Sequence, residues 1–265
     1  MRASTEAHWT RFWKERAEID DVYPTAGRVV DQLLTQGPIE GKLVLEVGAG
    51  SGRDSATLAE RGATAIMLDY SMASLLVSRD VAVRAGVTPL LVRADALRMP
   101  FRDGTFDVVF HQGLLEHFRD PKPLLRENVR VLKPDAVLLV DVPQRFHLYT
   151  VLKHALIAVG KWFAGWETEF TIGELERLMR GAGVRIVRRY GGWMIPGLVY
   201  RSTRLALLKA GLAKLPLDPP PVPLLTPLNA WVRSAWERTP FAFYTYFVIG
   251  AIGRKEGSAP SRAPV

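Results

Sequence analysis

The chain has 265 residues, of which 48% are hydrophobic, and its formal net charge is +8. This length and apolar content are enough for one sizeable core, so we expect a single domain over residues 1–265. The absence of cysteine excludes disulfides, thiolate metal sites and chemistry through a cysteinyl adduct. No 18-residue stretch is both apolar and uncharged, and the first 21 residues lack the apolar core of a signal peptide, which predicts a cytoplasmic protein without a spanning helix.

The positive charge is concentrated in one region. Nine basic residues and no acidic residue occur between Arg177 and Leu217. Such a region attracts nucleic acid, an anionic membrane surface or an acidic substrate. A solvated surface without any partner explains the same residues equally well.

Strand-like and helix-like segments alternate along the chain from residue 42 to residue 142. Apolar runs predict strands at 42–47, 63–69, 88–94, 106–111, 136–142, 184–190 and 241–252. Capping residues and helical spacing predict helices at 53–62, 71–85, 121–132 and 171–180. Ser71 is the expected N-cap of the second helix, and Thr171 with Glu174 forms a capping box for the last. This alternation is typical of an α/β fold built on a parallel sheet.

The remaining segments divide the predicted domain. We expect an N-terminal helical cap at 1–41, a cofactor-binding core at 42–142, insertions at 143–170 and 191–240, and a disordered tail at 253–265. The proline-rich run PLDPPPVPLLTP at 216–227 predicts a stiff polyproline connector within the second insertion.

The stretch LVLEVGAGSGRD, which begins at residue 43, is an apolar strand followed by glycines at alternate positions. A dinucleotide-binding turn has the spacing G-x-G-x-x-G, but Arg53 occupies the place of the third glycine. The acidic Glu46 before the turn would repel a pyrophosphate and suits a ligand with an ammonium group. S-adenosylmethionine fits this description, because it carries an adenosine, a sulfonium and a free amino acid end.

The chain resembles the class I S-adenosylmethionine-dependent methyltransferases, and among them the group that includes the quinone methyltransferases. The resemblance covers residues 42–190 and rests on the motifs VLEVGAGSG, MLDYS, RADALRMPFRDGTFDVVF and RVLKPDAVLLVDVP. It implies a Rossmann-like, doubly wound sheet of seven mostly parallel strands with an antiparallel last strand, S-adenosylmethionine as the cofactor, and methyl transfer. The family has Gly-Gly where this chain has Asp135-Ala136, which we interpret as a changed turn away from the site.

The resemblance assigns cofactor contacts to the ends of the first four strands. The glycines leave room for the methionine end, Asp69 accepts the ribose hydroxyls, and Tyr70 forms a wall for the purine. Asp95 and Ala96 reach the adenine edge, and Gln112 lies beside the sulfonium. The expected cofactor-binding residues are Glu46, Gly48, Ala49, Gly50, Gly52, Asp69, Tyr70, Asp95, Ala96 and Gln112.

Both insertions leave the carboxyl ends of strands, where ligands bind in open parallel sheets, so we expect them to form a lid over the acceptor. They mix large apolar side chains with basic ones, which favours a lipophilic acceptor (a lipid, a quinone-like molecule or a glycolipid precursor) and contact with the inner face of an anionic membrane. Simple packing of these helices on the sheet is an equally good explanation. An RNA or tRNA methyltransferase that uses the basic 177–217 region is the alternative function, and the sequence leaves the oligomeric state open.

Four of the five histidines are expected on the acceptor side: His111, His117, His147 and His154. His111 and His117 are the first candidates for the catalytic base, and Glu116 is the third. The stretch FHQGLLEHF lacks the acidic pair of metal-assisted enzymes, so no metal site is predicted. Tyr149 and Lys153 have the spacing of short-chain dehydrogenases, but without the nicotinamide glycine pattern we interpret them as neighbours on a lid helix, with the lysine reaching the surface.

Overall fold

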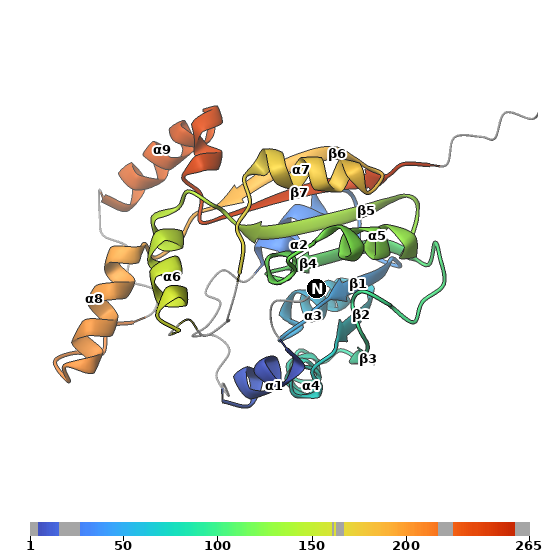
Figure 1. The fold of residues 1–265 in the computed structure, drawn as a ribbon, viewed down its shortest axis with the longest axis horizontal. Coiled ribbons are helices and arrows are strands. Elements are labelled where there is room, and N and C mark those ends of the chain that lie inside the picture. Colours follow the sequence, from blue (N-terminus) through green and yellow to red (C-terminus); the bar gives the residue numbers. More distant parts are fainter. Residues whose placement is uncertain (1–4, 16–26, 161, 163–166, 217–224, 258–265) are drawn as a thin grey trace, which may run out of the picture.

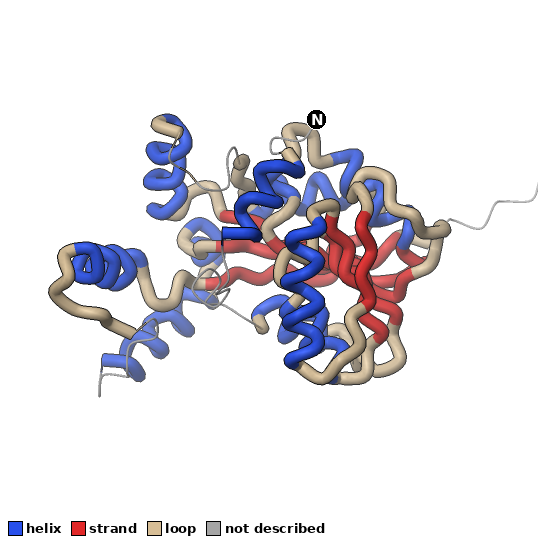
Figure 2. The backbone as a smooth tube through the Cα atoms, turned by 90° about the horizontal axis from the view of Figure 1, so that it is seen from below, coloured by secondary structure: helices blue, strands red, loops and turns tan. Residues whose placement is uncertain are grey.

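The computed structural model describes residues 5–15, 27–160, 162, 167–216 and 225–257. A central seven-stranded sheet lies between two layers of helices (Figures 1 and 2). The strands are β1 (Leu43–Val47), β2 (Thr64–Asp69), β3 (Leu90–Arg93), β4 (Phe106–Gln112), β5 (Leu132–Pro143), β6 (Val184–Gly192) and β7 (Val248–Lys255). The helices are α1 (Glu6–Glu15), α2 (Arg28–Leu34), α3 (Arg53–Glu60), α4 (Met72–Arg84), α5 (Lys122–Val131), α6 (Leu148–Ala158), α7 (Ile172–Gly181), α8 (Leu198–Lys209) and α9 (Leu225–Glu237), with 3-10 turns η1 (Leu115–His117) and η2 (Pro240–Tyr244).

The strand order is β3-β2-β1-β4-β5-β7-β6. Only β7 runs antiparallel to its neighbours, β5 and β6, which confirms the expected fold class. The order reverses between β1 and β4, because the chain first winds outward to β3 and then returns to the other side of β1. A reversal of this kind opens a crevice at the carboxyl ends of the two strands, where ligands bind in open α/β sheets.

Alternate residues of the central strands face opposite helical layers. Val44 of β1 belongs to an apolar cluster with residues of α2 and α3, whereas the next residue, Leu45, packs in a larger cluster with residues of α5 and α7. Both side chains are fully buried, and burying one such chain contributes about 1.5–3 kcal/mol. The sheet is therefore covered on both faces, as the continuous apolar runs of its parallel strands require.

The predicted helix starts agree with the structure. The side chain of Ser71 accepts the backbone N–H of Ser74, and Thr171 and Glu174 form both hydrogen bonds of the capping box. The predicted last strand, 241–252, is wrong at both ends. Pro240 opens the η2 turn and the strand runs from Val248 to Lys255, so residues 253–255 belong to the sheet and not to a tail. A proline has no N–H for a ladder and suits the first position of a helical turn.

Other predictions fall partly outside the described residues. Of the proline-rich run 216–227, residues 217–224 lie outside them, and the last three residues open α9 instead of continuing an extended connector. The predicted tail residues 258–265 and residues 16–26 of the N-terminal cap also lie outside them. None of the described helices is long and apolar enough to cross a membrane.

The Asp135 turn lies at the start of β5, away from the carboxyl ends of the strands. Asp135 has a φ of 59° and is the non-glycine residue with positive φ in the described part of the chain. Its carbonyl accepts a hydrogen bond of 2.9 Å from Arg254, and its carboxylate lies 3.6 Å from both Arg185 and Arg254. An aspartate thus adopts the left-handed conformation that glycine adopts without strain.

We expect the backbone strain at Asp135 to be measurable. Asp135→Gly removes the strain and Asp135→Ala keeps it, while both remove the same exposed ion pairs, which contribute little. Urea unfolding should give a free energy of unfolding about 1 kcal/mol lower for the alanine variant than for the glycine variant. Equal stabilities of the two variants would show that the turn carries no such strain.

Candidate active site

A cavity of about 300 Å³ opens at the carboxyl ends of the central strands. Residues from the ends of β1, β2, β4 and β5 line it on one side, and residues of α1, α2, α6 and α8 line it on others. It therefore occupies the crevice where the strand order reverses. Of the ten expected cofactor residues, eight line this cavity: Glu46, Gly48, Ala49, Gly50, Asp69, Tyr70, Ala96 and Gln112.

The glycine turn after β1 is held in a conformation that other residues rarely adopt. Gly48, Gly50 and Gly52 have φ values of 67°, 58° and 66°. A Cβ at Gly48 would lie 2.8 Å from the side chain of Leu114, and one at Gly50 would lie 2.8 Å from the ring of Trp13. Gly52 does not line the cavity, and a Cβ there would lie 2.7 Å from the sulfur of Met67 inside the core. Gly52 thus serves the packing of α3 on the sheet.

Glu46 is buried at the end of β1, where the hydroxyl of Ser55 donates to its Oε2 at 2.6 Å. Burial and the nearby carboxylate of Asp54 raise the pKa of Glu46 to about 8. An ammonium group placed beside it would favour the ionised carboxylate and lower this pKa again. The electrostatics therefore suit the cationic end of an amino acid.

Asp69, the last residue of β2, holds the glycine turn that follows β1. Its carboxylate accepts the N–H of Gly50 at 3.1 Å, the N–H of Ser71 at 2.8 Å and the hydroxyl of Ser74 at 2.9 Å. The backbone of Tyr70 also hydrogen-bonds to this carboxylate, and an ionised carboxylate offers about four acceptor sites. A ribose hydroxyl would therefore have to share Asp69 with these donors or displace one of them.

The adenine side of the site differs from the expectation at one residue. Asp95 is exposed, does not line the cavity and accepts the N–H of Leu97 with its own Oδ1 at 2.8 Å. Ala94, Ala96 and Tyr70 line the cavity instead. The side chain of Asp95 thus shapes the loop, and the neighbouring Ala96 lines the cavity.

No sequence motif indicated that α2 contributes to the cavity. Arg28 lines the cavity and makes a bidentate ion pair with Asp141, with distances of 3.1 Å and 3.0 Å, and the hydroxyl of Tyr190 donates to the same carboxylate at 3.0 Å. With its amide nitrogen toward Asp54, Gln112 donates to Asp54 at 3.3 Å and accepts from Arg28 at 3.2 Å. The guanidinium of Arg28 is thus fixed at the wall of the cavity, where it can bind a ligand carboxylate.

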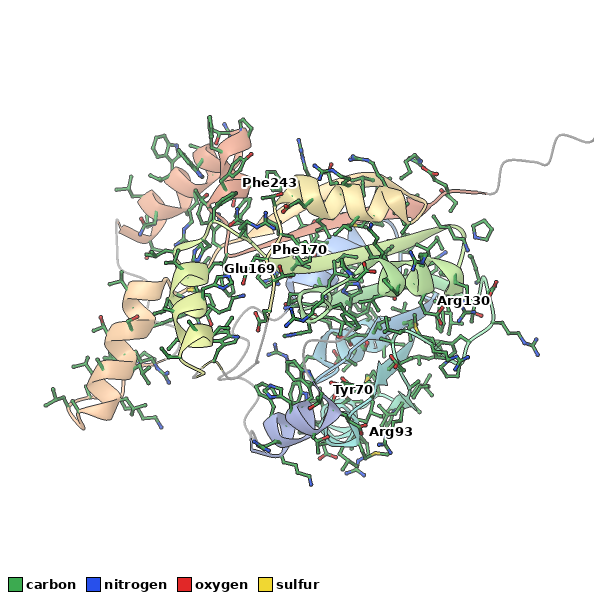
Figure 3. The ribbon with its side chains drawn as sticks, in the orientation of Figure 1. Tyr70, Arg93, Arg130, Glu169, Phe170 and Phe243 are labelled. Carbon is green, nitrogen blue, oxygen red and sulfur yellow. The ribbon has the colours of Figure 1, made fainter. Side chains whose placement is uncertain are left out.

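The N-terminal helix α1 covers the glycine turn with aromatic side chains. Trp13 lies against Gly50, and the ring of Trp9 meets the ring of His117 edge-on with centroids 4.8 Å apart. At the far edge of the helix, Glu6 forms a 2.8 Å ion pair with Arg93, which Figure 3 labels beside α1 and near Tyr70. This helix therefore shields the cavity from solvent on the cofactor side.

The two histidines proposed as bases lie in different places. His117 lines the cavity. His111 does not line it, is fully buried on the opposite face of β4, and burial lowers its pKa to about 3. His147 caps α6 by accepting the N–H of Tyr149, and His154 lies 2.7 Å from Glu169.

The interpretation of Lys153 as a surface residue is wrong. Its side chain is 2% exposed and its Nζ lies 2.7 Å from Glu167 and 2.6 Å from Glu169, the latter labelled beside α6 in Figure 3. Tyr149, Lys153 and Glu167 all line the cavity, as do Trp162 and Glu116. The first insertion thus supplies a buried polar wall, opposite the glycine turn, that sequence reasoning missed.

Residues 45–140 match the family model described as a methyltransferase domain. Over this part of its length the chain is similar to the class I S-adenosylmethionine-dependent methyltransferases. That family indicates S-adenosylmethionine as the cofactor. Three features of the cavity fit it: the glycine turn without side chains, the carboxyl of Glu46 and the guanidinium of Arg28 for the two ends of the amino acid, and Asp69 for the ribose.

Two relatives of the chain are named for quinone biosynthesis. It is 31% identical over 147 residues to the ubiquinone biosynthesis O-methyltransferase of Pseudomonas paraeruginosa, covering 54% of this chain and 62% of that protein. It is 35% identical over 104 residues to the demethylmenaquinone methyltransferase of Renibacterium salmoninarum, covering 39% of this chain and 42% of that protein. The chain thus spans less than two thirds of the length of these relatives.

A solved structure agrees with the fold over almost the whole chain. The S-adenosylmethionine-dependent methyltransferase of Thermotoga maritima superimposes with a TM-score of 0.62, covering 94% of this chain and 99% of that chain at 19% identity. At this level of identity the likeness shows the fold alone.

We expect Glu46 to make cofactor binding depend on pH. Below its pKa of about 8 the carboxyl is protonated, and the ammonium of S-adenosylhomocysteine needs the carboxylate. Calorimetry should therefore show a Kd that falls by up to ~10-fold per pH unit between pH 6 and pH 8, since one unit corresponds to about 1.4 kcal/mol. Glu46→Gln should bind at least ~10-fold more weakly at pH 8 and lose this dependence.

The matched control is Glu60→Gln, an exposed glutamate at the end of α3. It should reproduce the wild-type affinity and pH profile. A Glu46→Gln variant with the wild-type profile would remove Glu46 from the binding site.

Proposed function

We propose that this domain transfers a methyl group from S-adenosylmethionine to a small lipophilic acceptor by in-line displacement. The observation that carries the proposal is the continuity of one cavity. It runs from the glycine turn and Asp69 to a wall of large side chains from the insertions and the region before β7. Those side chains are Tyr149, Trp162, Met194, Arg201, Phe247 and Val248.

Bound S-adenosylmethionine supplies an electrophilic methyl group on its sulfonium. The chain's own residues hold and orient the two partners, which is the largest part of catalysis in such a displacement. Glu46 and Arg28 fix the amino acid end, and the tryptophans of α1 exclude water from the reacting atoms.

The large side chains that line the cavity on the acceptor side fit a flat, apolar molecule. The ring of Tyr149 meets Trp162 and Phe247 edge-on, with centroids 5.8 Å and 5.1 Å apart. Such aromatic walls bind planar rings with favourable edge and face contacts. A quinone-like acceptor agrees with this geometry and with the names of the two relatives.

Contact with an anionic membrane is the second part of the proposal. The distal helices α6, α8 and α9 all lie at the left of Figure 1, beyond the arrowhead of β5, with α9 above the other two. They expose Val199 at 81%, Leu148 at 68% and Trp231 at 68%. Tyr149 of α6 and Arg201 of α8 also line the cavity, so the exposed apolar surface begins at its edge.

The charges near the distal helices favour an anionic partner. From residue 198 to residue 216 the chain has basic residues and no acidic one, and Lys214 is exposed. Arg233 lies over the ring of Trp193 and Arg238 is exposed, while Glu237 of α9 accepts the indole N–H of Trp193. Exposed apolar residues with interspersed cations suit the headgroup layer of a bilayer.

The RNA methyltransferase alternative gains no support from the described residues. Several cations of the basic region have local partners on separate elements. Arg180 pairs with Glu176 at 2.9 Å and Arg188 donates to Gln32 at 3.0 Å, both outside the distal helices. A polyanion is bound best by cations that share one face, so this alternative stays a prediction from the sequence.

A methyl-transfer assay tests the main proposal. Purified protein with tritiated S-adenosylmethionine and a cell extract should label the fraction that partitions into organic solvent. Calorimetry should show binding of S-adenosylhomocysteine and none of a nicotinamide dinucleotide. Label in the RNA fraction alone would support the alternative, and dinucleotide binding without S-adenosylhomocysteine binding would contradict the proposal.

Vesicle flotation tests the membrane part. The protein should float with phosphatidylcholine vesicles that contain phosphatidylglycerol, and rising salt should weaken this binding. Val199→Ser with Trp231→Ser should reduce it at least ~10-fold, since each apolar side chain contributes on the order of 1–3 kcal/mol when buried. Leu76→Ser with Val83→Ser, two exposed positions of α4, is the control and should float like wild type. Equal flotation of both double variants would place the membrane contact elsewhere.

A further inference from the structure

Glu116 is a buried glutamate, and one of its carboxyl oxygens takes part in no hydrogen bond with the described residues. It follows β4 in the η1 turn, is 3% exposed and lines the cavity. A Cβ at Gly113 would lie 3.6 Å from its Oε1, so the side chain folds back over the end of β4. Its Oε2 has no hydrogen-bond partner among the described residues. A buried oxygen of this kind is costly to leave unpaired, and in a cavity it points to a ligand that supplies the missing partner.

The charged side chains of the first insertion pair with one another and not with Glu116. Lys153 lies between Glu167 and Glu169, at 2.7 Å and 2.6 Å. The second oxygen of Glu167 accepts the indole N–H of Trp162 at 2.9 Å. The backbone carbonyl of Glu116 accepts the N–H of Thr168 at 3.0 Å, which joins this segment to the η1 turn. The cluster therefore holds a fixed wall and leaves the carboxyl of Glu116 for the acceptor.

The charge of this cluster sets the protonation of Glu116. Burial and the carboxylate of Glu167 raise its pKa well above the usual range, Asp141 adds to this, and Lys153 opposes it. One ammonium faces two carboxylates, so the wall is already net negative before Glu116 ionises. A carboxyl with a raised pKa is a stronger base once it is ionised, and it comes closer in proton affinity to a phenol than an ordinary glutamate does.

We propose that Glu116 is the catalytic base of the methyl transfer and that the acceptor atom is the oxygen of a phenolic hydroxyl. This inference rests on the proposed function. The hydroxyl oxygen forms the new O–CH₃ bond, the S–CH₃ bond breaks with its electron pair going to sulfur, and the hydroxyl proton passes to Oε2 of Glu116. The products are an aryl methyl ether, the neutral thioether S-adenosylhomocysteine and a protonated Glu116.

The geometry favours Glu116 over the two histidines. His111 lies outside the cavity, and His117 lies under Trp9 of α1, toward the cofactor side. The aromatic wall of Tyr149, Trp162 and Phe247 fits a planar ring in the same cavity that Glu116 lines. Lys153 and Glu167 are positioning residues. They form an ion pair with each other, and the charge of each acts on the carboxyl of Glu116.

The experiment uses the full chain and three probes in detergent micelles. They are 4-dodecylcatechol, 4-dodecylaniline and dodecylbenzene, each with S-adenosylmethionine that carries a deuterated methyl group. Mass spectrometry should find a methyl ether of the catechol and no product from the other two. Methylation of the aniline or of ring carbon, or no product from the catechol by a protein that labels an extract, would overturn the hydroxyl acceptor. A protein that labels no extract fraction contradicts the underlying function instead.

Glu116→Gln keeps the shape of the side chain and removes the base. We expect kcat to fall at least ~100-fold, with the Kd of S-adenosylhomocysteine within about twofold of wild type. Glu60→Gln, the exposed control, should keep the wild-type kcat. A Glu116→Gln variant with more than about a third of the wild-type kcat would overturn the assignment.

The pH profile separates a base from a structural residue. Wild-type kcat should rise with pH through one ionisation, and Glu116→Gln should lose this limb. Glu167→Gln should move the limb to lower pH, because it removes a negative charge that raises the pKa of Glu116. An unmoved limb in both variants would overturn the proposal.

Infrared spectroscopy gives a test without turnover. At neutral pH the difference between wild type and Glu116→Gln should contain the C=O band of a protonated carboxyl, and the band should vanish as the pH rises. A missing band at neutral pH would show that Glu116 is ionised in the free protein and would contradict the role assigned to its charged neighbours.

Discussion

The hydrogen bond from the N–H of Gly50 to Asp69 is the constraint on which the rest of the site depends. It joins the turn after β1 to the end of β2. The hydroxyl of Ser74 in α4 lies 2.8 Å from the Gly50 carbonyl oxygen and 2.9 Å from the Asp69 carboxylate, so its one proton is shared between these two acceptors. The turn keeps its left-handed conformation because Gly48 and Gly50 carry no side chain. One network thus fixes two strand ends and one helix start around the space for the cofactor.

Two buried clusters of paired charges lie at the same edge of the sheet. The buried ion pair of Arg28 and Asp141 and the buried lysine of α6 with its two glutamates both line, or directly support, one cavity. Burying a charge is costly unless it is paired and hydrogen-bonded. Their concentration at the strand ends therefore favours a binding role for these groups over a purely structural one.

Most of the fold could be predicted from local sequence patterns. Most of the site could not, because it depends on contacts between segments that are far apart in the sequence. The glycine turn, Asp69 and the capping residues were predictable because each acts within a few residues of its own element. Arg28 was not, since its partner Asp141 is 113 residues away and no motif links them. The two glutamates that bury Lys153 follow it by 14 and 16 positions, beyond the reach of a helical pattern.

The placement of His111 could have been predicted more closely. Side chains alternate along a strand, so His111 and Gln112 must face opposite sides of β4. Since Gln112 lies toward the cofactor in the resemblance, His111 had to face the other layer, where the structure places it. The last strand failed for a related reason: the aromatic run before Val248 fits a strand by composition, but Pro240 begins a 3-10 turn that packs Ala242 and Tyr246 into the core.

The donor side and the acceptor side of the cavity have different surroundings. The donor side is enclosed by α1, while the acceptor side borders helices that expose large apolar residues. A lipophilic acceptor held in a bilayer would reach the cavity along α6 and α8 without crossing water, since both helices contribute to the cavity and to the exposed surface. The hydrophobic effect that would bring the protein to the membrane would then also favour transfer of the acceptor into the aromatic wall, and the buried polar cluster behind that wall would select a hydroxyl among apolar molecules.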